Sequence, residues 1–149
     1  MNRDEVLMQS RTAFGLFLLL FLVTGCSQVS GSTTPGVTLS RYRTFYIVRD
    51  KQTDATDAMQ KALSMRGFIV TTGPESSLPA GTDCKVLVRD HWTWDMTMYL
   101  LELQVDVLDP RTGALYAQGR SYHPSLERKD AETMANEVVE KIFGSAEKR

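Results

Sequence analysis

The sequence has few of the residues that build metal and redox sites. Its 149 residues include two histidines and two cysteines. His91 and His123 lack a second ligand at the spacing of zinc sites, and the chain has no phosphate-cradling glycine loop, Gly-x-Ser-x-Gly elbow or His-Glu-x-x-His motif. Asp90 and His91 are neighbours, so on a strand they would point to opposite faces. We therefore expect no catalytic residue, no metal and no cofactor, and a protein that is not an enzyme.

The sequence also lacks an excess of charge of either sign. Lys and Arg together number 17 and Asp and Glu number 18, which gives a formal net charge of −1. Residues 1–25 contain equal numbers of basic and acidic side chains, so their removal would leave this balance unchanged. A nearly neutral domain has no electrostatic field to attract a polyanion. We expect no nucleic-acid partner.

No apolar run is long enough to cross a bilayer as a helix, which takes about 20 residues. The uncharged run 13–23 instead has the length of the central region of a secretory signal. Asp4 and Glu5 precede it although such signals begin with a positive segment, which favours Met8 over Met1 as the true start. We predict that residues 1–25 are an export signal.

The run ends in Val23-Thr24-Gly25-Cys26, which resembles the lipobox of bacterial lipoproteins. The resemblance implies that Cys26 becomes the mature N-terminus and carries diacylglyceryl and acyl groups such as palmitate. In lipoprotein sorting, a serine after this cysteine implies transfer to the outer membrane, whereas an aspartate would imply retention at the inner membrane. Ser27 therefore predicts a lipid-anchored protein on the periplasmic face of the outer membrane.

With Cys26 used for lipid, Cys84 has no partner for an intrachain disulfide. Cys84, Val86 and Val88 alternate with polar residues and share one face of an expected strand. We interpret Cys84 as a small buried core residue rather than a reactive or metal-binding thiol.

The mature chain divides into a tether and one domain. Residues 26–38 are rich in Ser, Thr and Gly without periodicity and predict a flexible tether. Residues 39–144 suffice for one domain with one core, and residues 145–149 are expected to fray. Thr53 or Asp54 would cap a first helix ending near Gly67, and Asp130 would cap a second ending near Gly144.

Alternating apolar patterns predict strands over residues 43–49, 68–72, 84–90, 98–108 and 114–121. A right-handed crossover makes the second strand parallel to the first, and the loop 109–113 makes the last two strands an antiparallel hairpin. In the fourth strand, Tyr99, Leu101, Leu103, Val105 and Val107 would share the covered face. We expect an α+β fold of order βαβββα, with two helices on one face of a mostly antiparallel five-stranded sheet.

The candidate binding surface lies in residues 90–99, which hold both tryptophans. In an extended chain, Trp92, Trp94 and Met96 would lie on one side, and His91 and Asp95 on the other. Exposed, this segment would bind a protein or stack on a sugar ring. Alternatively, one or both indoles cover the end of the core. We predict that one tryptophan covers the core and the other, Trp94, is exposed.

The polar segment 120–130 is a second candidate surface, although a solvated connector is the simpler interpretation. It follows the last strand and precedes the second helix.

The mature region resembles small Gram-negative lipoproteins grouped in uncharacterised families. The resemblance rests on the strands 44–48 and 83–88, the turn 108–113 and Gly119-Arg120. It implies a non-catalytic outer-membrane lipoprotein that acts as an adaptor or binding module for an envelope protein or peptidoglycan. The alternative is a small periplasmic hydrolase or a lipid-anchored enzyme inhibitor.

Overall fold

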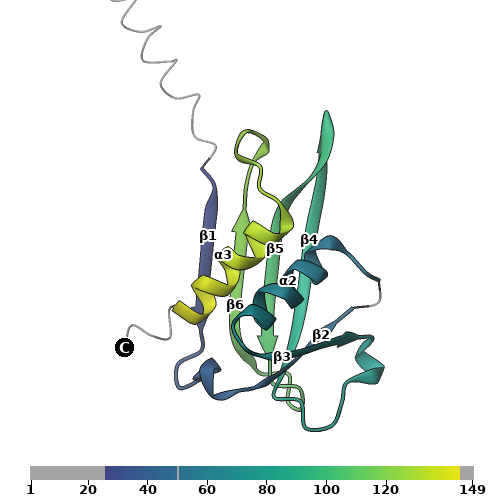
Figure 1. Ribbon diagram of the computed structural model, residues 1–149. Helices are drawn as coiled ribbons and strands as arrows, with labels where there is room; N and C mark the ends of the chain where they lie inside the picture. Colours follow the sequence, from purple (N-terminus) through teal and green to yellow (C-terminus); the bar gives the residue numbers. More distant parts are fainter. Residues whose placement is uncertain (1–25, 50, 145–149) are drawn as a thin grey trace, which may run out of the picture.

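The computed structural model describes residues 26–49 and 51–144, which form one six-stranded sheet and two α-helices (Figure 1). The expected signal 1–25 and tail 145–149 lie outside the described residues. The strands are β1 Gln28–Thr33, β2 Thr44–Val48, β3 Ile69–Gly73, β4 Cys84–Asp95, β5 Thr97–Leu108 and β6 Leu115–Tyr122. The helices are α2 Asp54–Met65 and α3 Ala131–Gly144, with short 3₁₀ turns η1 Leu39–Arg41, η2 Glu75–Ser77 and η3 Ser125–Glu127. Within the described part, neither helix has the length and apolar character needed to cross a membrane.

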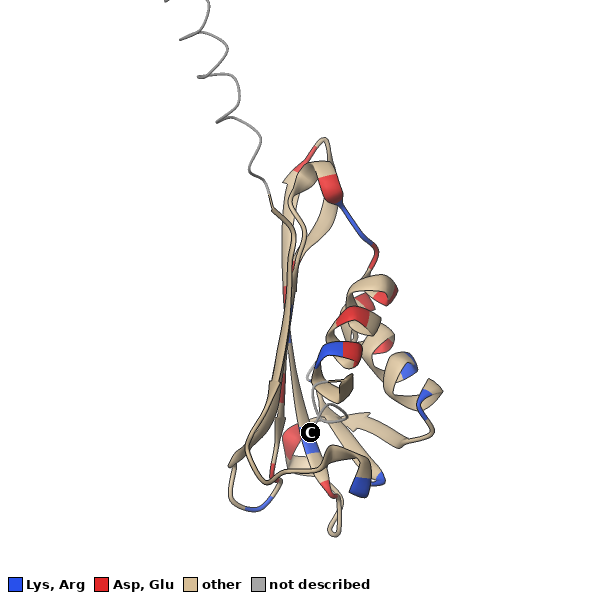
Figure 2. Ribbon diagram, turned by 90° about the vertical axis from the view of Figure 1, so that its left-hand side faces the viewer, with Lys and Arg blue, Asp and Glu red and all other residues tan. Residues whose placement is uncertain are grey.

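Both helices pack on the same face of the sheet, as the sequence predicts, and the chain has the α+β class (Figure 2). The core lies between the helices and this face. Its largest fully buried side chains include Phe45, Ile47, Met59, Leu103, Met134 and Ile142. Cys84 is fully buried in the same cluster. The opposite face of the sheet carries no helix (Figure 2).

The sheet differs from the prediction in having six strands and a mixed pattern. The strand order is β1-β6-β5-β4-β2-β3, in which β2 runs parallel to both β3 and β4 and the other pairs are antiparallel. The additional strand, β1, occupies residues predicted to be a flexible tether, so that prediction is wrong for 28–33. Alternate residues of β1 are half-buried beneath α3, and its backbone pairs with β6 from Gln28–Tyr122 to Thr33–Ala117. Pairing with an open sheet edge stabilises a strand even where its side chains are small and polar.

Two facing glycines allow α3 to lie directly on β1 and β6. Gly31 pairs with Gly119. A Cβ on Gly31 would lie 2.6 Å from Cβ of Lys141, and one on Gly119 would lie 2.7 Å from Cγ1 of Val138. Thr33 Oγ1 also donates to the Ile142 carbonyl at 3.0 Å. The helix therefore fixes β1 to the domain.

We predict that Gly31→Val lowers the free energy of unfolding by about 2 kcal/mol, because the α3 backbone must move to admit the side chain. Urea unfolding measures the change. Ser30→Val is the matched control, since Ser30 is exposed on the face without helices. Equal stability of both variants and the wild type would contradict the close packing of α3 on β1.

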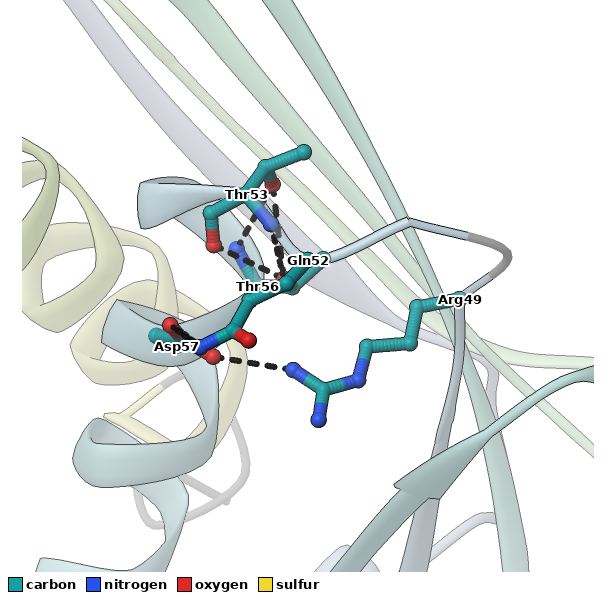
Figure 3. A network of polar contacts seen from close by, with 5 residues as sticks. All are labelled: Arg49, Gln52, Thr53, Thr56 and Asp57. Carbon is teal, nitrogen blue, oxygen red and sulfur yellow. Dashed lines mark hydrogen bonds and ion pairs between the residues drawn. The ribbon is translucent and has the colours of Figure 1, made fainter.

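A polar network fixes the start of α2 after β2 (Figure 3). Thr53 caps the helix as expected, because its hydroxyl accepts from the Thr56 N–H at 3.2 Å while Thr56 Oγ1 accepts from the Thr53 N–H. Asp57 accepts from Arg49 at 2.9 Å and from Gln52 at 2.7 Å. The two threonine contacts satisfy backbone N–H groups that would otherwise be unpaired at the helix start, and the Asp57 contacts bond the preceding segment to the helix.

A β-bulge changes which residues of β5 face the helices. His91 of β4 pairs with Glu102, but the next residue, Trp92, pairs with Leu100. The additional residue, Leu101, reverses the alternation on β5. The sequence prediction is therefore correct for Leu103, Val105 and Val107 but wrong for Tyr99 and Leu101, and Leu100 is the buried residue instead.

Candidate functional site

The strands β4 and β5 form a long hairpin whose end projects past the neighbouring elements (Figure 1). Each strand has 12 residues, so β4 continues through the segment predicted to be a connection. Met96 alone separates Asp95 from Thr97 and has a φ of 60°. A non-glycine residue in this left-handed region costs on the order of 1 kcal/mol. The chain holds a methionine at the extreme end of its longest hairpin despite this cost.

The end of the hairpin carries three exposed large apolar side chains. Trp94 is 68% exposed, Met96 is 88% exposed and Met98 is 57% exposed. Trp94 pairs with Met98 across the hairpin. We call these three residues the apolar tip. Leu126 of η3, which is 97% exposed, lies in the loop at the same end of the molecule (Figure 1).

The two tryptophans have different surroundings, as predicted. Trp92 is half-buried and packs against the core cluster. Its indole N–H donates to Asp90 Oδ2 at 2.7 Å. Trp94 has the exposed position expected for it.

The other two predicted surface residues do not join the apolar tip. His91 is exposed on the opposite face of β4, where it pairs with Glu102 of β5. Asp95 Oδ2 forms an ion pair with Arg128 at 3.1 Å. Asp95 therefore holds the hairpin in place.

Arg128 is a residue that sequence reasoning missed, although it lies in the polar segment 120–130. Its Nη2 donates to the Asp95 carbonyl at 2.7 Å, and its Nη1 donates to Thr97 Oγ1 at 2.8 Å. Its guanidinium lies 4.3 Å from the ring centroid of Tyr99. The loop before α3 is thus bonded to the end of the hairpin through Arg128.

A buried polar cluster links β6 to α3. Ser121 Oγ donates to Glu137 Oε2 at 2.8 Å, and His123 Nε2 lies 2.8 Å from the same oxygen. Burial raises the pKa of Glu137, but hydrogen bonds from Lys129, His123 and Ser121 outweigh it and hold the pKa below its ordinary value. In a catalytic triad the serine would contact the histidine, which would contact the acid. Here the carboxylate contacts both, and Ser121 and His123 are almost completely buried.

The two cysteines lie in opposite environments. Burial, with the nearby charges of Asp83 and Asp109, raises the pKa of Cys84 to about 12, so its thiol is unreactive at neutral pH. Cys26 is exposed, two residues before the start of β1. No three His, Cys, Asp or Glu side chains lie close enough to hold a metal ion in residues 26–49 and 51–144.

The face of the sheet without helices carries paired charges and amides. Arg120 Nε contacts Glu102 Oε1 at 2.6 Å, and its guanidinium lies 5.2 Å from the ring centroid of Tyr122. Arg89 contacts Asp106 at 2.6 Å. The hydrogen bond from Arg120 holds the pKa of Glu102 below its ordinary value. A hollow of about 380 Å³ lies here, lined by Ser30, Gly31, Ser32, Arg89, Gln104, Asp106, Gln118, Gly119 and Arg120. We call this surface the open face.

Two solved structures have the same arrangement of sheet and helices. The PelC dodecamer from Paraburkholderia phytofirmans matches with a TM-score of 0.58 and 10% identity, covering 79% of this chain and 99% of that chain. A variant PelC dodecamer from the same organism matches with a TM-score of 0.55 and 13% identity, covering 76% of this chain and 97% of that chain. At this identity the likeness shows the fold alone. Comparison with protein-family models and with curated proteins gives no match.

Proposed function

We propose that the chain is a non-catalytic lipoprotein of the outer membrane, facing the periplasm, that binds an envelope component. The observation that carries the proposal is the position of Cys26. This residue ends the lipobox-like sequence and is exposed where the folded domain begins. A lipid there would anchor the domain without any change in its fold.

The open face is the surface best suited to a partner in the periplasm, and peptidoglycan is the partner we favour. The guanidinium, carboxylate and amide groups of the open face hold one another in place, as in the Arg120–Glu102 and Arg89–Asp106 pairs. Such fixed donors and acceptors suit the hydroxyl and amide groups of a glycan with peptide side chains. The aromatic ring of Tyr122 beside Arg120 offers a surface for stacking.

The first test of the proposal concerns lipidation. We predict that Cys26→Ser abolishes it, so that the mass of the diacylglyceryl and acyl groups is missing from the protein isolated from the envelope. Lipid on the Cys26→Ser protein would contradict the lipobox prediction.

The second test concerns the partner. Arg120→Ala should weaken cosedimentation of the detergent-solubilised chain with isolated peptidoglycan by about tenfold, because it removes a charged donor and releases Glu102. Arg111→Ala is the matched control, since it removes the same charge from an exposed loop. If the two variants bind equally well, the open face is not the peptidoglycan surface. An envelope protein would then be sought by crosslinking in the native envelope.

A further inference from the structure

The expected lipid attachment point and the apolar tip lie at the same end of the sheet. Gln28 at the start of β1 pairs with Tyr122, which in turn pairs with Glu102 of β5. Gln28, Tyr122 and Glu102 are the last residues paired across β1, β6 and β5 at this end, and the hairpin continues beyond them from Glu102 to Met96. The start of β1, the loop before α3 and the hairpin end all lie at this end of the molecule (Figures 1 and 2).

The hairpin extends further in this direction than the lipid attachment point. At about 3.4 Å per residue, the strand from Glu102 to Met96 spans roughly 20 Å. Cys26 lies two residues before Gln28 and is at most about 7 Å from it. If lipid on Cys26 enters the bilayer, the hairpin end reaches about 13 Å further along the strand direction, which exceeds the thickness of one headgroup layer. With the strands along the bilayer normal, the hairpin end therefore meets the bilayer surface.

The chemistry of the tip fits this position. Trp94, Met96 and Met98 are exposed and uncharged, and tryptophan favours the boundary between headgroups and acyl chains. The nearest carboxylate, on Asp95, is neutralised by Arg128. Leu126 adds a fourth exposed apolar side chain at this end. In water these apolar side chains stay exposed at a cost in free energy, whereas insertion into a lipid surface would bury them.

We propose that the apolar tip is a second membrane contact, which inserts into the bilayer surface beside the lipid on Cys26. The two contacts together fix the tilt of the domain and turn its far end toward the periplasm. This proposal rests on the lipid anchor of the proposed function. It assigns the Trp94 surface to lipid rather than to a protein or a glycan.

Fluorescence quenching tests the proposal on the lipidated mature chain in phosphatidylcholine vesicles. In Trp92→Phe, Trp94 is the sole tryptophan, and lipids brominated on their acyl chains should quench it and shift its emission to shorter wavelength. The matched control carries Ile69→Trp with Trp92→Phe and Trp94→Phe. Ile69 is 62% exposed and lies at the opposite end of the sheet, so this indole should stay unquenched. Equal quenching at both positions, or none at Trp94, would overturn the proposal.

Vesicle flotation of the unlipidated mature chain, residues 26–149 with Cys26→Ser, separates the tip from the anchor. We expect weak binding that falls about tenfold with Trp94→Ser, the effect of removing one buried indole. The binding should be insensitive to salt, because the tip carries no net charge. Met65→Ser changes another exposed apolar residue, at the far end of the domain, and should leave the binding unchanged.

The outcomes separate the two proposals. Absence of lipid on wild-type Cys26 would refute the lipoprotein proposal alone. Equal flotation of the Trp94→Ser and Met65→Ser proteins would refute the tip contact alone. Burial of Trp94 in a partner protein would appear as an indole shielded in envelopes but not in pure lipid vesicles, which would also overturn the tip contact.

Discussion

Glu137→Ala should lower the free energy of unfolding by about 3 kcal/mol. The carboxylate is the shared partner of Ser121 and His123, and Lys129 also contacts it. Its removal leaves two buried polar side chains without their acceptor. Urea unfolding followed by circular dichroism measures the loss.

Glu140→Ala is the matched control for this substitution, because Glu140 lies on the exposed side of the same helix. It should change stability by less than about 0.5 kcal/mol. A similar loss in both variants would mean that helix propensity rather than the buried cluster is responsible.

The same carboxylate predicts how stability depends on pH. The pKa of Glu137 is held below its ordinary value of 4.5 in the folded state, so the unfolded chain binds its proton first as the pH falls. The stabilisation is therefore complete above about pH 5 and is lost as the pH falls through the folded-state pKa. Glu137→Gln should flatten this part of the stability profile. An unchanged profile would contradict the assigned role of the ionised carboxylate.

Trp92→Ala should cost about 3 kcal/mol, because the indole covers the end of the core and its N–H is bonded to Asp90. Trp94→Ala should cost less than about 0.5 kcal/mol, since that side chain is mostly exposed. Thermal and urea unfolding of the two variants provide the comparison. Equal losses would mean that the apolar tip is part of the folded core, and the membrane contact would lose its basis.

The features that sequence reasoning predicts correctly depend on neighbouring residues. Thr53 and Asp130 cap their helices as expected, because a short polar side chain before an amphipathic segment can bond the first free N–H groups. The turn after β5 is also local. Asp109 accepts from the Arg111 N–H, the Tyr116 hydroxyl and the Thr112 N–H, which together lower its pKa to about 2.

The features that it misses depend on contacts between distant parts of the chain. The Ser and Gly residues of β1 have the composition of a linker, and only the free edge of β6 makes them a strand. The bulge at Leu101 is set by the pairing of β5 with β4, and the apolar run from Met98 to Leu101 does not show which of its residues face the helices. Arg128 and Glu137 are surface-type residues in the sequence, and their roles come from partners on β4, β5 and β6.

If Cys26 carries the proposed lipid, the pairing of β1 has a mechanical consequence for the anchored domain. A force that draws the domain away from the membrane acts along β1, at right angles to its hydrogen bonds with β6. The hydrogen bonds of β1 from Gln28 to Thr33 are then loaded together in shear, so they do not break one after another. The close packing of α3 on Gly31 also opposes movement of β1 along β6. A short strand that joins anchor to domain thereby becomes a rigid link that transmits tension to the whole sheet.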